Sequence, residues 1–153
     1  IAEAALVALA RGPVMLQMWP ACEFLPQVLL SLWEEARRQH ADNESMLRRL
    51  SNTAVSKVQS LSFLFRIGQP MSLRAEAVRA RVEGKNKRSS KLLDRAIESA
   101  EQRQMPMARL AALCERARSE PDSAARKVRA AEVAQQALAL GCHYFAIQAQ
   151  RLG

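Results

Sequence analysis

Cationic side chains are the residues of this chain whose type and spacing most directly suggest a binding chemistry. The sequence has 23 Lys and Arg residues against 15 Asp and Glu residues, which gives a formal net charge of +8. The densest basic cluster consists of Lys85, Lys87, Arg88 and Lys91. Such a cluster can contact phosphate groups, but no aromatic residue lies within it to stack on a base. The alternative is a solvated turn whose charges stabilise the C-terminus of the preceding helix.

Catalytic and metal-binding patterns are not found in the sequence. It contains no P-loop, no dinucleotide-binding glycine pattern, no nucleophile elbow and no H-E-x-x-H motif. Cys142 and His143 are adjacent, but neighbours on a helix point about 100° apart, so we expect the thiol in the core and the imidazole in solvent. The three cysteines form no C-x-x-C pair, which favours a reducing cytoplasm. We expect a protein that is not an enzyme and carries no cofactor or metal ion.

The composition indicates one helical domain. Apolar residues make up 49% of the chain and aromatic residues only 5%, and there are few glycines or prolines. These values argue against a disordered chain and against a turn-rich β-sandwich. No apolar run is long enough for a membrane span, so we expect no membrane contact. Because the chain begins at Ile1 rather than Met, and Glu3 does not suit a signal peptide, we expect a piece of a longer cytoplasmic protein.

Glycine and proline divide the chain into segments of helical length. In the segment that follows Pro26, an apolar face of Val28, Leu29, Leu32, Trp33 and Ala36 is expected to be buried, with Glu34 and Glu35 in solvent. Gly84 and Gly141 are C-cap signals, and Asp122 is an N-cap signal. The predicted helices span 2–11, 26–40, 44–67, 71–83, 87–103, 106–119, 122–140 and 142–152, with a possible break near 51–53. Short links between the last five predict antiparallel helical hairpins.

An internal repeat appears at the 34-residue period of tetratricopeptide repeats (TPR). In 70–103, small residues at the helix crossing are Ala77, Ser89 and Ala96, and Gly84 lies at the turn. A weaker copy, 107–140, has Ala130, Ala134 and Ala137 at matching steps, but Glu120-Pro121-Asp122 replaces the glycine turn. Small residues let two helix backbones approach closely. The sequence therefore predicts an all-α fold of antiparallel hairpins stacked as a TPR-like α-solenoid.

Four longer sequence segments follow one another along the second half of the chain, and together they carry a resemblance to a known family. They are RARVEGK at 79–85, LLDRAIESAEQRQMP at 92–106, a helix ending in ERA, and AQQALALGCHYFAIQAQRL at 134–152. This stretch resembles the TPR-like helical region of large bacterial signalling proteins, which join a protein kinase or class III nucleotide cyclase to a STAND/AAA-type ATPase core. The resemblance implies degenerate helical repeats at 1–70, TPR-like hairpins at 71–153, and catalytic motifs in other domains.

These observations predict a regulatory repeat domain that binds a peptide or protein partner and regulates an attached catalytic domain. Candidate partner-binding residues lie on the first helix of each hairpin and are expected not to pack; they are Arg74, Arg79, Arg81, Arg109 and Arg116. Their charge favours an acidic partner segment. The alternative is a basic helical module that binds nucleic acid non-specifically through Lys85, Lys87, Arg88 and Lys91.

A cluster of aromatic and methionine residues precedes these repeats. It comprises Met15, Met18, Trp19, Phe24 and Trp33. Methionine-rich surfaces adapt to many ligands, so the cluster could form a partner groove. The alternatives are a packed seam between two helices and a face covered by an upstream domain.

Overall fold

A computed structural model of the protein describes residues 19–153, with side chains from Phe24 onward. Within this part of the chain all regular structure is helical, which confirms the all-α prediction. None of the described helices is both long and apolar enough to cross a bilayer. The predicted helix at 2–11, together with Met15 and Met18 and the side chain of Trp19, lies outside what is described.

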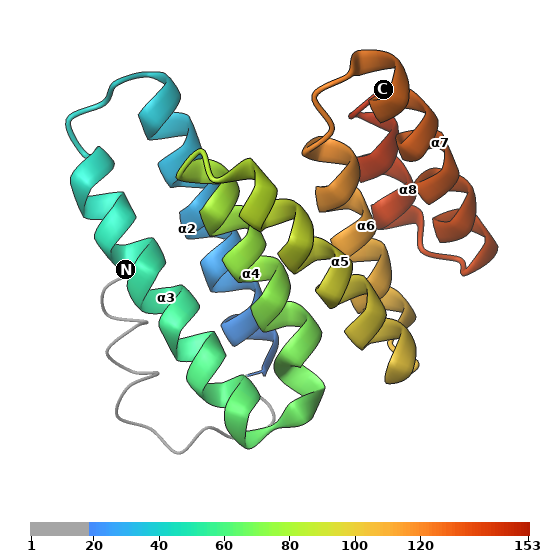
Figure 1. Ribbon diagram of the computed structural model, residues 1–153, viewed down its shortest axis with the longest axis horizontal. Coiled ribbons are helices and arrows are strands. Elements are labelled where there is room, and N and C mark those ends of the chain that lie inside the picture. Colours follow the sequence, from blue (N-terminus) through green and yellow to red (C-terminus); the bar gives the residue numbers. More distant parts are fainter. Residues whose placement is uncertain (1–18) are drawn as a thin grey trace.

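The described residues form seven α-helices and one 3-10 turn (Figure 1). Short turns connect them, so successive helices run antiparallel. The helices are α2 (Trp19–Arg38), α3 (Glu44–Leu64), α4 (Gln69–Val82), α5 (Asn86–Gln102), α6 (Pro106–Arg118), α7 (Ser123–Ala139) and α8 (His143–Gln150), and the turn is η2 (Arg66–Gly68). From α4 onward the bounds agree closely with the sequence prediction.

Local capping chemistry explains this agreement. Gly84 and Gly141 follow α4 and α7 with φ values of +80° and +69°, a left-handed conformation that glycine adopts without steric cost. The Asp122 carboxylate accepts a hydrogen bond of 3.0 Å from the backbone N–H of Ala124, which caps α7 as predicted. Pro70 and Pro106 lie in the first turns of α4 and α6, where a missing N–H removes no helical hydrogen bond.

The first two helices differ from their predicted form. Helix α2 begins at Trp19 rather than at Pro26, so Pro26 lies inside it and is buried. A proline there removes one backbone hydrogen bond, and burial of Leu29, Leu30 and Trp33 along the same helix offsets that loss. Val28 and Leu32, which were expected in the apolar face, are exposed.

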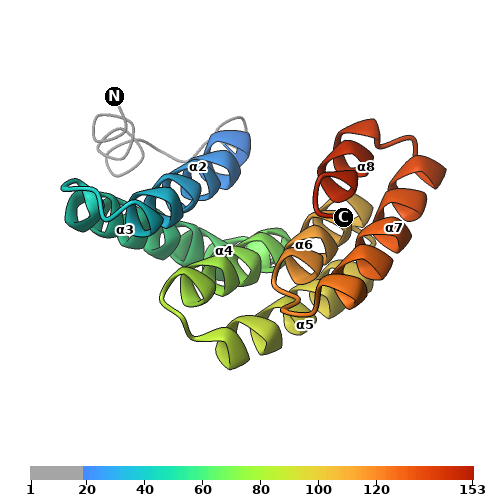
Figure 2. The same ribbon diagram turned by 90° about the horizontal axis from the view of Figure 1, so that it is seen from above.

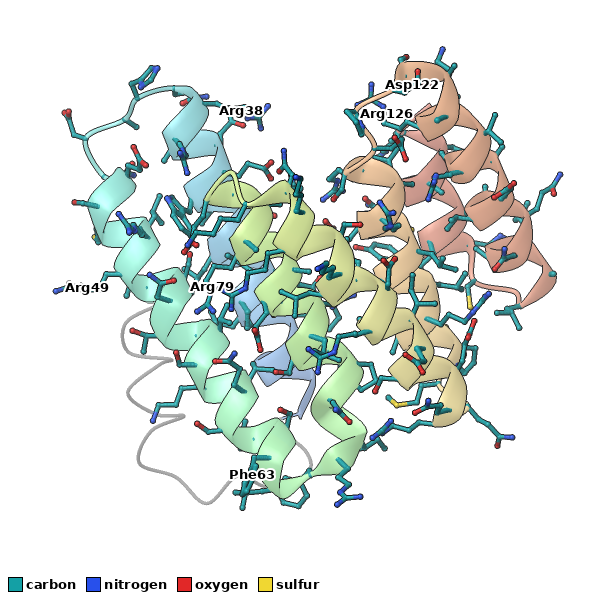
Figure 3. The ribbon with its side chains drawn as sticks, viewed as in Figure 1. Arg38, Arg49, Phe63, Arg79, Asp122 and Arg126 are labelled. Atoms are coloured by element: carbon teal, nitrogen blue, oxygen red, sulfur yellow. The ribbon has the colours of Figure 1, made fainter. Side chains whose placement is uncertain are left out.

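Helix α3 has no break at 51–53 and ends earlier than predicted. Thr53 donates a hydrogen bond of 3.0 Å to the carbonyl of Arg49, and Ser51 is buried. The chain leaves the helix at Phe65, whose backbone is extended. Phe65 is exposed and forms an apolar turn with Phe63, which lies at the end of α3 (Figure 3).

The helices pack in two layers along a curved stack (Figure 2). Each helix contacts the next in the chain, and α2, α4, α6 and α8 also contact one another in succession. No comparable contact joins α3 to α5 or α5 to α7 among the described helices. The helices of one layer touch one another, whereas those of the other layer are farther apart, and this difference curves the stack. Helices α2, α4, α6 and α8 therefore lie on the inner side of the curve.

The core is a series of small clusters rather than one large centre. One lies between α2, α3 and α4 around Trp33 and Val55, the next between α4, α5 and α6 around Leu93, and the last between α6, α7 and α8 around Leu110. The small residues predicted at the crossing of α4 and α5 are all buried; they are Ala77, Ser89 and Ala96. Each helix pair is thus stabilised by its immediate neighbours.

Candidate partner-binding groove

A groove of about 560 Å³ lies between the four inner helices. Its apolar lining includes large side chains from the first two turns of each of these helices: Phe24 of α2, Met71 of α4, Met107 of α6, and Tyr144 and Phe145 of α8. Leu30 and Val78 line it farther along α2 and α4. Phe24, Met107 and Tyr144 are large side chains that remain 57%, 50% and 63% exposed. Since the inner helices run in the same direction, their beginnings form one end of the groove.

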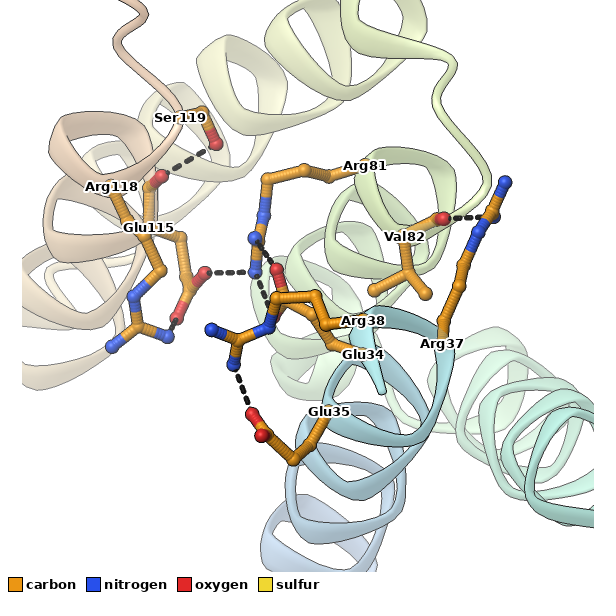
Figure 4. A network of polar contacts seen from close by, with 9 residues as sticks. All are labelled: Glu34, Glu35, Arg37, Arg38, Arg81, Val82, Glu115, Arg118 and Ser119. Atoms are coloured by element: carbon orange, nitrogen blue, oxygen red, sulfur yellow. Dashed lines mark hydrogen bonds and ion pairs between the residues drawn. The ribbon is translucent and has the colours of Figure 1, made fainter. Parts of the chain in front are cut away.

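Ion pairs connect the opposite ends of three inner helices (Figure 4). Arg81 of α4 pairs with Glu34 of α2, donating to its Oε2 at 3.2 Å, and lies 3.5 Å from Oε2 of Glu115 of α6. Arg118 pairs with the other oxygen of Glu115 at 3.0 Å. The Arg81 side chain is only 14% exposed. The network therefore holds α2, α4 and α6 at a fixed separation, and Glu34 is not the solvated carboxylate expected from the sequence.

The predicted partner-binding arginines do not gather in the groove. Arg74 does line it but is only 7% exposed, so the expectation that this side chain does not pack is wrong. Arg109 pairs with Glu101 of α5 at 2.7 Å and donates to Gln136 of α7, also at 2.7 Å. Arg116 pairs with Asp94 of α5 at 3.2 Å. These two arginines join α6 to the outer helices.

Arg79 lies on the side of α4 that faces α3 (Figure 3). There the hydrogen bond from Lys85 lowers the pKa of the Glu83 carboxyl; burial opposes this effect, and the charges of Lys85, Arg79 and Arg48 reinforce it. Lys85 lies 2.6 Å from Glu83. Arg79 and Lys85 thus belong to a charged surface around the end of α4, outside the groove.

The sequence reasoning missed Arg118, Glu115 and most of the apolar lining. Of that lining, only Phe24 was considered for a partner groove, as part of the aromatic and methionine cluster. A usable signal was present: Met71, Met107 and Tyr144 each stand within three residues of a helix start. Since alternate helices run in the same direction, their starts lie at the same end of the stack. A large apolar residue repeated at these starts therefore indicates one shared apolar surface.

The remaining basic residues lie elsewhere. Lys87, Arg88 and Lys91 border a separate hollow of about 430 Å³ together with Arg95, Leu92 and Glu76. This hollow shares no residue with the groove. Three of the four residues predicted to contact phosphate are therefore brought together, and the fourth, Lys85, is held by Glu83.

The groove contains a thiol but no reactive constellation. Burial raises the pKa of the Cys114 thiol to about 11, and the charge of Glu115 adds to this effect. A thiol with such a pKa stays protonated at neutral pH and is a poor nucleophile. Cys142 is partly buried and donates a hydrogen bond to the sulfur of Met107 at 2.9 Å, while His143 is exposed. Among the described residues no three His, Cys, Asp or Glu side chains are grouped to hold a metal ion.

Comparison of the chain with family models, with curated proteins and with solved structures finds no match. A function must therefore be inferred from the groove itself. In it, apolar side chains from four helices surround a hollow, and Glu115 and Arg118 of the ion-pair network also line it.

Proposed function

We propose that this chain is a TPR-like α-solenoid that binds a peptide segment of a protein partner in its inner groove. In the longer protein, which we infer to be a bacterial cytoplasmic signalling protein, this binding regulates an attached catalytic domain. The observation that carries the proposal is the convergence of Phe24, Met71, Met107 and Tyr144, from four different helices, on one groove. Large, partly exposed apolar side chains of this kind are typical anchors of a binding site.

The arrangement of the helices supports the solenoid. Among the described helices, extensive contacts between alternate helices occur on the inner side, and small residues are buried where α4 crosses α5. In a solenoid each repeat contacts only its neighbours, so curvature depends on a few local interfaces. A peptide that contacts both α2 and α8 would favour one curvature over others. A change in curvature would move the two ends of the stack relative to each other, and this movement would reposition an attached domain.

Charge supports a partner segment that is apolar and acidic. No acidic residue lies in the first turn of α2, α4, α6 or α8, so the positive ends of these helix dipoles have no carboxylate of their own beside them. The large, partly exposed side chains Phe24, Met71, Met107 and Tyr144 lie near these ends. A peptide with two large apolar side chains flanked by Asp or Glu would fit both features, and the net charge of +8 would favour its approach.

The test is selection of 15-residue peptides that bind the protein, followed by affinity measurement with matched variants. Tyr144→Ala removes a groove side chain from α8, and Ile147→Ala removes another exposed apolar side chain of the same helix that lies outside the groove. We expect Tyr144→Ala and Phe24→Ala to weaken binding at least tenfold, and Ile147→Ala to change it less than twofold. Thermal unfolding should be nearly unchanged, because all three residues are exposed.

Equal effects of Tyr144→Ala and Ile147→Ala would contradict the proposal, since binding would then not depend on the groove. Substitution of arginines tests the groove less clearly than these variants, because it changes the stability of the fold as well as binding. Arg81 joins three helices, so its removal is expected to lower stability and partner binding together.

A further inference from the structure

Three cations form a row along one face of α5. Lys87, Lys91 and Arg95 are four residues apart, so they lie above one another on the helix surface. All three are exposed, and Arg88 lies beside them at the edge of the same hollow. Helix α5 belongs to the outer layer of the stack, away from the inner groove (Figure 2). The α5 row, as we name Lys87, Lys91 and Arg95, is therefore a second surface that is independent of the groove.

No carboxylate of the described chain forms a direct ion pair with the cations of the α5 row, although Asp94 and Glu98 stand on the same helix. The nearest acidic residue of the hollow, Glu76, lies 3.8 Å from Arg88. Asp94, which is next to Arg95 in sequence, pairs instead with Arg116 of α6. Arg81, Arg109, Arg116 and Arg118, by contrast, each pair with a carboxylate.

Repulsion between its own cations and its position on the helix both make the α5 row electrostatically unfavourable when no ligand is bound. Like charges four residues apart on a helix repel each other. Lys87 and Arg88 also lie in the first turn of α5, where the helix dipole disfavours a cation. An anion that contacts several of these side chains removes both penalties. A bound anion is thus the simplest partner for the row.

The shape of the row indicates which anion. Two intervals of four residues extend about 12 Å along the helix, with one cation about every 6 Å. One isolated phosphate can contact only part of such a row, whereas a chain of phosphates can follow all of it. The hollow contains no aromatic side chain for base stacking. We propose that the α5 row binds a linear chain of phosphates, as found in a nucleic-acid backbone or in inorganic polyphosphate, without reading base sequence.

The experiment measures binding of a fluorescent single-stranded 20-nucleotide oligouridylate by anisotropy between 50 and 200 mM salt. With about three phosphates neutralised, log K should fall against log salt with a slope near −2. The triple variant Lys87→Gln, Lys91→Gln, Arg95→Gln should bind at least tenfold more weakly at 50 mM salt and lose most of this slope. Its unfolding temperature should not fall, because the substitutions remove repulsion.

The matched control is Lys57→Gln, Lys127→Gln, Arg151→Gln, which removes the same charge from exposed positions outside the hollow. We expect it to change affinity less than threefold. Equal losses in the two triple variants would overturn the proposal, because binding would then reflect net charge alone. Absence of binding by the unmodified protein at 50 mM salt would overturn it as well.

Competition distinguishes the sources of the anion. Inorganic polyphosphate that displaces the oligonucleotide more effectively than unlabelled oligouridylate would indicate polyphosphate, and the reverse order would indicate nucleic acid. Polyglutamate of equal charge should compete at least tenfold less well than either. Equal competition by polyglutamate would refute a preference for phosphate. Tyr144→Ala should bind the oligonucleotide normally, so failure of this proposal and failure of the groove proposal are separable.

Discussion

The arginines at the ends of the inner helices and the cations of the α5 row have the same charge but opposite surroundings. Arg81 and Arg118 are partly buried and held by Glu34 and Glu115 from the same or neighbouring helices. The α5 row is exposed and has no such carboxylates among the described residues. The cations of this chain therefore form two populations, one that holds helices together and one that is available to a ligand.

The direction of the helix dipole separates these populations. Basic residues fall in the last turns of α2, α4 and α6, where the dipole favours a positive charge. The α5 row begins in the first turn of its helix, where the dipole disfavours one. The inner arginines thus stabilise the fold, whereas the α5 row is expected to destabilise it slightly. Substitutions in the two regions should therefore change stability in opposite directions.

The largest effect is expected at Arg81. Arg81→Met keeps the aliphatic stem but leaves Glu34 and Glu115 without the charge between them, and Glu115 Oε2 is buried. We expect a loss of about 2 kcal/mol in the free energy of unfolding, less than for a fully buried ion pair. Urea unfolding at pH 7 measures it. Lys91→Met is the control and should stay within about 0.5 kcal/mol of the unmodified protein; equal losses would remove the contrast.

A smaller effect of opposite sign is expected in the α5 row. Lys87→Glu places a carboxylate in the first turn of α5 and creates a favourable pair with Lys91 one turn later. We expect the protein to become more stable by about 0.5–1 kcal/mol, by the same urea measurement, and the affinity for oligouridylate to fall. A variant that lost stability would show that the row is not strained in the free protein.

The smallest effect is expected at Lys85, which belongs to the basic cluster but has a carboxylate partner. The Glu83 pKa is lowered from 4.5, mainly by the hydrogen bond from Lys85. The stabilisation is therefore present above pH 4.5 and is lost as the pH falls through the lowered pKa. Lys85→Ala should cost at most about 0.5 kcal/mol at pH 7 because the pair is partly exposed. Unfolding measured from pH 7 to 3 should show the two proteins converging; a difference that persisted at pH 3 would contradict this explanation.

The candidate sites illustrate how far sequence reasoning reaches. The α5 cluster was found because its residues are close in the chain, and three of its four members do border one hollow. The groove was not found from the arginines, since only Arg74 of the five lines it and that side chain is buried. Glu34 was expected in solvent because it lies off the apolar face of its helix, but its partner, Arg81, comes from a different helix. A sequence pattern that spans a few residues does not predict which side chains of different helices lie close together.

Signals that act within a few residues specify the helices from Gln69 onward and the turns between them. Gly84, Gly141 and Asp122 act within a few residues of their own position, so their effect is local. Tertiary structure alone decided that Pro26 lies within α2, that Phe63 and Phe65 are exposed, and which cations are paired. The physical reason is that helix caps and apolar periodicity are short-range, whereas burial and ion pairing depend on which helices pack together.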